Sequence, residues 1–108
     1  MIDLIASNQR DIAERCRAFG IRKLEVFGSA ATGTFDPSHS DIDLIADLGE
    51  YERGVAKRYL RFARAMEQLL HVPVEIITEE QIRNPYFRQA VDEQRTTIHG
   101  AGDRQAAA

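Results

Sequence analysis

The chain has 108 residues, of which 44% are apolar, and a formal net charge of −3 at pH 7. This length predicts a single domain over residues 1–100, followed by a disordered tail over residues 101–108 that has no core-forming residue beyond alanine. The acidic balance excludes a protein that grips a nucleic-acid backbone by itself. The lack of a long apolar segment predicts a cytoplasmic protein that does not associate with membranes.

The first half of the chain predicts a helix followed by two strands. Apolar residues recur at helical spacing from Ile5 to Phe19, which predicts an amphipathic helix over residues 3–19 that ends at Gly20. Cys16 falls on the apolar face of this helix, so we expect a core-facing thiol and not a nucleophile. The segments that follow are predicted as a strand (21–27), a short helical turn (29–33), a loop (34–40) and a second strand (42–47).

The second half begins with a long predicted helix over residues 52–71, whose apolar residues recur every three or four positions. Its other face is basic, and is either a solvated helix face or a surface that offers positive charge to an acidic partner or a phosphate. Spacing does not distinguish these readings. The basic residues are Lys57, Arg58, Arg61 and Arg64. The later segments are predicted as a strand (72–78), a helix start capped by Thr78, a last helix from Pro85 and an edge strand (96–99).

Two acidic residues, Asp41 and Asp43, alternate with apolar residues at the start of the second strand. Both carboxylates should point the same way, about 6.6 Å apart along the chain, because successive side chains of a strand alternate between its faces. Two solvated acids would show the same pattern, but the preceding Gly28-Ser29 favours phosphate chemistry. Glycine removes the Cβ where a backbone approaches an anion, and Ser29 adds a hydroxyl at the start of a helical turn. Carboxylates together with substrate phosphates are the usual magnesium ligands, so the pattern predicts phosphoryl or nucleotidyl transfer.

These two segments, Val26-Phe27-Gly28-Ser29 and Ser40-Asp41-Ile42-Asp43-Leu44, resemble the signature of the nucleotidyltransferase superfamily that shares the DNA polymerase beta catalytic fold. Within it, the chain is similar to the minimal nucleotidyltransferases (MNT), which include MntA-type antitoxins paired with HEPN-domain toxins. The resemblance covers roughly residues 20–99. It implies an α/β (α+β) fold with a small mixed sheet flanked by helices, which agrees with the predicted order of helices and strands.

The superfamily also uses a third carboxylate on a later strand, and Glu75 is the candidate here, because it occupies the middle of the β-branched segment 72–78. A solvated Glu on an edge strand is the alternative. This chain departs from the family in three ways. It has Glu where Asp is usual, and it has eleven residues between Ser29 and Asp41 where the family more often has ten. It also lacks the arginine that often follows Gly-Ser. Phosphate binding then needs another basic residue or is weaker than in relatives.

The resemblance implies an antitoxin that transfers AMP from ATP, with magnesium (two ions), to a tyrosine of a separately encoded HEPN ribonuclease toxin. Asp41, Asp43 and Glu75 would hold metal and act in catalysis, and Gly28 and Ser29 would bind the nucleotide. A different hypothesis is a binding module of the same fold that inhibits its partner by occlusion and transfers nothing. A free-standing enzyme acting on a small molecule is the third.

Overall fold

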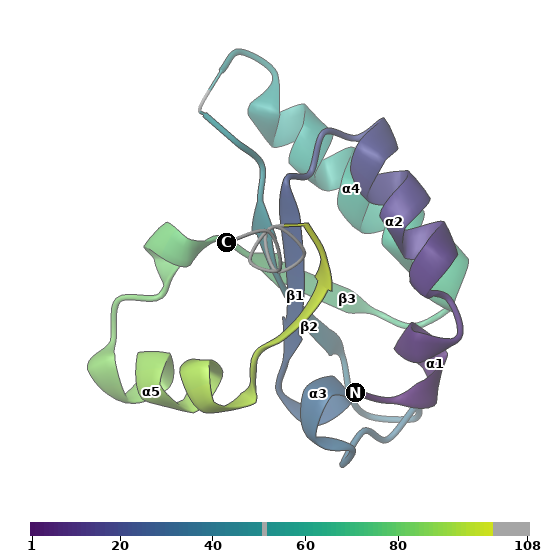
Figure 1. Ribbon diagram of the computed structural model, residues 1–108, viewed down its shortest axis with the longest axis vertical. Helices are drawn as coiled ribbons and strands as arrows, with labels where there is room; N and C mark the ends of the chain where they lie inside the picture. Colours follow the sequence, from purple (N-terminus) through teal and green to yellow (C-terminus); the bar gives the residue numbers. More distant parts are fainter. Residues whose placement is uncertain (51, 101–108) are drawn as a thin grey trace, which may run out of the picture.

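Four β-strands form one mixed sheet in the computed structural model, which describes residues 1–50 and 52–100 (Figure 1). The strands are β1 (Lys23–Phe27), β2 (Ile42–Asp47), β3 (Val74–Ile77) and β4 (Thr96–His99). Their spatial order is β3-β2-β1-β4, in which β1 is antiparallel to β2 and β4, while β2 is parallel to β3. The predicted disordered tail over residues 101–108 lies outside the described residues.

Helices cover both faces of the sheet, as predicted for a mixed sheet flanked by helices. They are α1 (Asp3–Ala6), α2 (Gln9–Ala18), α3 (Ser29–Thr32), α4 (Val55–Leu70), the 3₁₀ turn η1 (Glu79–Gln81) and α5 (Pro85–Gln94). Figure 1 shows α2 and α4 side by side against one face, with α5 on the other side of the sheet. In the described part of the chain, no helix is both long enough and apolar enough to cross a bilayer.

The prediction of one continuous N-terminal helix is wrong, because the helix breaks at Ser7 and Asn8 into α1 and α2. The Asn8 side chain donates to the Leu4 carbonyl at 2.8 Å. Asparagine is neutral to unfavourable inside helices because its amide offers the backbone such local alternatives to the helical ladder. The predicted end of this segment at Gly20 is confirmed, since Gly20 has a positive φ of 70°.

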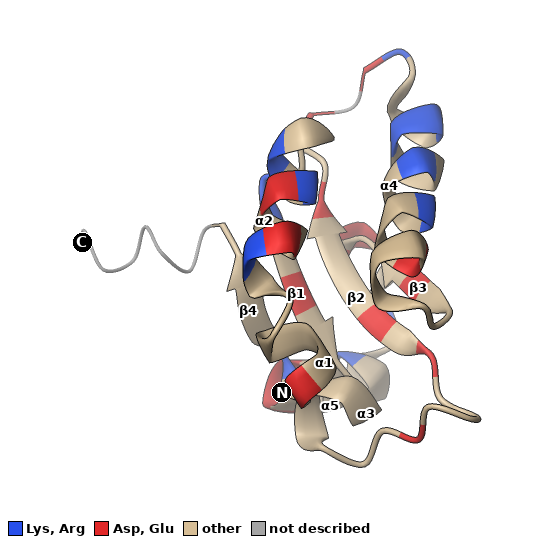
Figure 2. Ribbon diagram, turned by 90° about the vertical axis from the view of Figure 1, so that its right-hand side faces the viewer, with Lys and Arg blue, Asp and Glu red and all other residues tan. Residues whose placement is uncertain are grey.

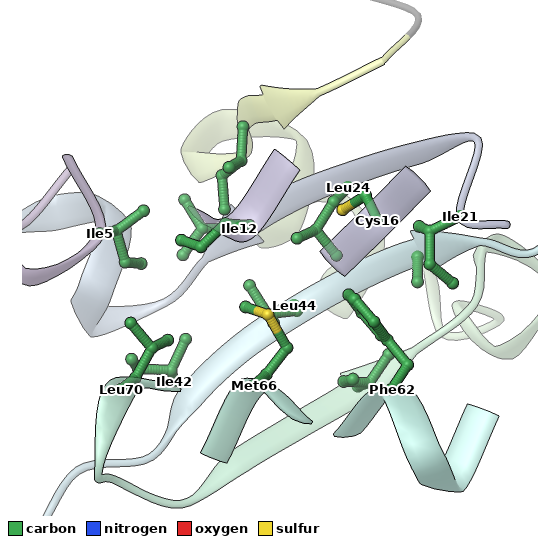
Figure 3. Close-up of a cluster of buried hydrophobic side chains, with 14 of the residues drawn as sticks. Ile5, Ile12, Cys16, Ile21, Leu24, Ile42, Leu44, Phe62, Met66 and Leu70 are labelled. Carbon is green, nitrogen blue, oxygen red and sulfur yellow. The ribbon is translucent and has the colours of Figure 1, made fainter. Parts of the chain in front are cut away.

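The main core lies between the sheet and the pair α2 and α4 (Figure 3). Phe62 and Met66 of α4 point toward Leu44 of β2, while Cys16 of α2 packs by Leu24 of β1. Burial raises the pKa of the Cys16 thiol to about 12, so the thiolate is disfavoured. The prediction of a core-facing cysteine is therefore confirmed.

One of the four basic residues of α4 has a structural role. Arg58 donates to the carbonyls of Phe19 and Gly20, each at 3.1 Å, and to that of Leu48 at 2.9 Å. It thereby binds the negative end of α2 and the segment after β2, where a cation is electrostatically favoured. The other three, Lys57, Arg61 and Arg64, are exposed, and Figure 2 shows basic positions in successive turns of α4.

Side chains of α4 also cover the free edge of β3. The Glu67 carboxylate accepts from the Val74 N–H at 3.0 Å, and the Tyr59 hydroxyl donates to the Ile76 carbonyl. Unpaired backbone N–H and C=O groups at a sheet edge can otherwise form hydrogen bonds with a strand of another chain. Glu75 and Ile77 alternate with these residues, so their backbone groups face β2 and their side chains share the sheet face opposite α2 and α4.

Candidate active site

The side chains of Phe27, Asp43 and Glu75 lie next to one another across the sheet, on the face opposite α2 and α4. Asp43 of β2 is paired in register with Phe27 at the end of β1 and with Glu75 of β3. Residues paired in register point to the same face, so the carboxylates of Asp43 and Glu75 are neighbours. Asp41 lies just before β2, is exposed, and is close enough for its charge to act on Asp43. The structure thus brings the three predicted acids to one end of the sheet.

Gly28 follows Phe27 directly and lies against Asp43. A Cβ added at Gly28 would come within 2.5 Å of the Asp43 Oδ2, and Gly28 also has a positive φ of 70°. Both facts exclude a larger residue here, since only glycine adopts this conformation readily and real Cβ atoms do not come so close to an oxygen. Ser29 opens the four-residue helix α3 and is partly exposed. The predicted Gly-Ser turn therefore touches the predicted acidic pair.

The carboxylates of these three acids lack internal partners. Among the described residues, the side chains of Asp41, Asp43 and Glu75, which we call the acidic row, form no hydrogen bond or ion pair, although those of Glu25 and Glu67 are both engaged. Burial, with the charges of Glu75 and Asp41 as smaller causes, raises the pKa of Asp43 to about 6. A raised carboxylate pKa beside like charges is a mark of candidate functional sites.

A magnesium ion fits these residues in part. No group of three His, Cys, Asp or Glu side chains within residues 1–50 and 52–100 is arranged to hold a metal ion by itself. Magnesium, however, is usually held through one or two carboxylates with substrate phosphates and water as the remaining ligands. Adjacent, unpaired carboxylates beside a glycine turn are the donor set for such binding.

Two residues at the end of α5 contact β1 and the turn that follows it, and sequence reasoning did not identify them. The Gln94 side-chain oxygen accepts from the Gly28 N–H at 3.0 Å. Its neighbour Arg95 donates to both carboxylate oxygens of Glu25, at 3.1 and 2.7 Å. Glu25 is 6% exposed, and its acidic character within an apolar strand was the only sequence signal. The Gln94 contact joins residues 66 apart, and no local pattern marks it.

Residues 10–98 match the nucleotidyltransferase domain family. Two proteins of Methanocaldococcus jannaschii that are named as candidate protein adenylyltransferases are similar. One is 29% identical over 75 residues, which cover 69% of this chain and 74% of the relative, and the other is 24% identical over 91 residues, which cover 84% and 87%. The structure of a candidate minimal nucleotidyltransferase is 28% identical with a TM-score of 0.70, over 88% of this chain and 95% of that one.

Two toxin–antitoxin structures share the fold. One, determined with AMP-PNP, has 20% identity and a TM-score of 0.67, over 93% of this chain and 79% of that one. The other is a tri-AMPylated HEPN toxin of Shewanella oneidensis in complex with its MNT antitoxin, with 15% identity and a TM-score of 0.61, over 95% and 78%. The predicted fold class is confirmed by these likenesses, and the predicted enzyme class by the family match.

Proposed function

Because the chain belongs to the nucleotidyltransferase domain family, we propose that it transfers AMP from ATP to a hydroxyl of a separate protein. The acceptor we propose is a tyrosine of a HEPN ribonuclease toxin, which the modification would silence. The naming of the M. jannaschii relatives and the modified toxin in the S. oneidensis complex support this acceptor class. The observation that carries the proposal is the row of unpaired carboxylates beside the Gly28 turn.

In the proposed reaction, the acceptor oxygen attacks the α-phosphorus of ATP. An oxygen–phosphorus bond to the acceptor forms, the bond between the α-phosphorus and the bridging oxygen breaks, and pyrophosphate leaves. Glu75 would take the hydroxyl proton, while Gly28 and Ser29 would bind the phosphates. Asp41 and Asp43 would hold magnesium, which neutralises charge on the phosphates when bound.

An occluding binding module is the second candidate, and two observations favour it. The described residues contain no preformed three-ligand metal group, and the longer Glu75 replaces the usual Asp. On the other hand, docking alone does not require a half-buried Asp43 whose charge is unfavourable in the free protein. Neutralisation of the toxin by a variant that cannot bind metal would separate the two candidates.

The test is transfer of labelled AMP from ATP with magnesium to the protein encoded beside this chain. We compare the wild type with the double variant Asp41→Asn/Asp43→Asn, and with Asp11→Asn as the matched control, because Asp11 is an exposed aspartate of α2 on the other side of the sheet. Label that is lost only in the double variant supports transfer. Neutralisation without label, retained in the double variant, would replace transfer with occlusion.

A further inference from the structure

A cavity of about 1070 Å³ lies beyond the end of β3, beside the part of β2 that follows Asp43. Its floor includes Ile45, which is two residues beyond Asp43 and points to the same face. The first turns of α4 form one wall and η1 forms another. We refer to this cavity as the β2 groove.

The groove reaches the proposed catalytic row through Tyr59. The Tyr59 side chain lines the groove, and its hydroxyl donates to the carbonyl of Ile76, the residue after Glu75. Burial and, second, the nearby Glu75 charge raise the pKa of Tyr59, which agrees with this proximity. An extended segment lying over Ile45 needs only about two residues, roughly 6.6 Å, to reach the position of Asp43.

The walls of the groove are apolar and its surroundings are acidic. Leu60 lines the groove and is 58% exposed, so its side chain is available to an apolar group of a ligand. The lining contains four carboxylates, of which Glu25 and Glu79 are paired with Arg95, and Glu25 also with Lys23 at 3.7 Å. Among the described residues, the two that form no ion pair are those of Asp47 and Glu80.

The apolar wall and the charge of the groove together indicate which ligand fits. In the proposed reaction, the triphosphate of ATP binds at the Gly28 turn and at magnesium held by the two aspartates of the acidic row, so the groove is left for another ligand. A peptide segment that combines an apolar side chain with Lys or Arg is complementary to the apolar wall of the groove and to the carboxylates of Asp47 and Glu80. We propose that the β2 groove binds a basic and apolar segment of the acceptor protein and so delivers the acceptor hydroxyl to the row of Asp43 and Glu75. The inference rests on the proposed function, because it names how that acceptor is recognised.

Two groove variants and two matched controls test the inference. Leu60→Ser and Glu80→Lys change exposed groove residues, while Tyr86→Ser and Glu14→Lys make comparable changes at exposed positions outside the groove. Affinity for the protein encoded beside this chain is measured by titration calorimetry with the full chain, and ATP affinity is measured separately with magnesium. Partner binding is thus read without requiring any transfer.

We expect each groove variant to weaken partner binding about tenfold, as is typical for truncating an interface hot spot, while both controls remain within about twofold. ATP affinity should not change in any variant. The wild-type complex should weaken with added salt, and Glu80→Lys should reduce that dependence.

Other occupants of the groove give different results. Loss of ATP affinity in Leu60→Ser would assign the groove to the nucleotide base, and a change in self-association would assign it to a second copy of the chain. Either result would overturn the inference, as would unchanged partner binding or a wild type that binds no partner. If groove variants weaken the complex but the wild type transfers no AMP, the groove assignment stands and the proposed function fails.

Discussion

Replacing Asp43 with Asn should stabilise the protein in the absence of metal. Burial and the charges of Glu75 and Asp41 raise the pKa of Asp43 to about 6, about two units above the ordinary aspartate value. Two units correspond to roughly 3 kcal/mol of unfavourable interaction with the ionised form. Because the side chain is partly open to water, solvent screening reduces this figure, and we expect a gain of about 1 kcal/mol.

The pH dependence follows from the same shift. As the pH falls, Asp43 takes up its proton at a higher pH in the folded protein than in the unfolded chain. The destabilisation caused by the ionised carboxylate is therefore complete above about pH 7, and it disappears as the pH falls toward the pKa of the unfolded chain, near 4. The advantage of Asp43→Asn should therefore be present at pH 7.5 and absent near pH 4.

Thermal unfolding with EDTA measures the difference. A gain of about 1 kcal/mol corresponds to an increase in Tm of roughly 4–8 °C for a domain of this size. Asp47→Asn is the control, because it makes the same change on the same strand at an exposed position, and it should leave Tm nearly unchanged. Equal or lower stability of Asp43→Asn at pH 7.5 would refute the reasoning, as would a gain that persists at pH 4.

Three further predictions concern the supports of the site. Arg95→Leu should reduce the free energy of unfolding by about 3 kcal/mol in urea titrations, because it leaves the buried Glu25 without its hydrogen-bond donors and with only the Lys23 ammonium at 3.7 Å, and the double variant Glu25→Leu/Arg95→Leu should recover most of this loss. An equal loss in the double variant would contradict this. Gly28→Ala should reduce AMP transfer at least tenfold with an unchanged circular dichroism spectrum, whereas Gly33→Ala, which shares the positive φ but has open space around its Cβ position, should retain transfer. Comparable losses in both would show that backbone strain, and not the contact with Asp43, is responsible. Gln94→Ala should reduce stability by about 1 kcal/mol because the Gly28 N–H loses its acceptor, while Gln94→Glu keeps an acceptor and should remain closer to the wild type. The exposed Gln89→Ala is the control on the same helix, and a Gln94→Ala variant as stable as this control would show that the contact contributes nothing.

The elements were predictable from the sequence where burial alone determines them. Strand β2 has the predicted bounds because its alternating apolar residues fix one face in the core, and this alternation also places Asp41 and Asp43 on the other face. The pairing of Asp43 with Glu75 was not predictable from periodicity, because it depends on the parallel register of β2 and β3. That part of the site came from the family resemblance.

Local side-chain chemistry and long-range contacts account for the rest. The helix break at Asn8 depends on one hydrogen bond of the Asn8 side-chain amide, which the spacing of apolar residues does not predict. The regular spacing of basic residues along α4 predicted that all four share one exposed surface, but Arg58 instead donates to a carbonyl at the end of α2. The contact of Gln94 with Gly28 exists only because α5 returns to the end of β1 after 66 residues.

The two halves of the outer sheet face differ in how their charges are balanced. Over β1, the three carboxylates of Glu25, Glu79 and Asp92 are matched by the three cations of Arg95, Arg88 and Lys23, so this half is internally neutralised. Over β2 and β3, the charges of Asp43 and Glu75 have no such partner among the described residues. A cation with a bound nucleotide would neutralise them, and because ligand binding to the folded state stabilises it, magnesium and ATP together should raise the Tm of the wild type. The variant Asp43→Asn should gain less, since the charge that the ligand neutralises is already gone. An equal gain in both proteins would place the nucleotide away from Asp43.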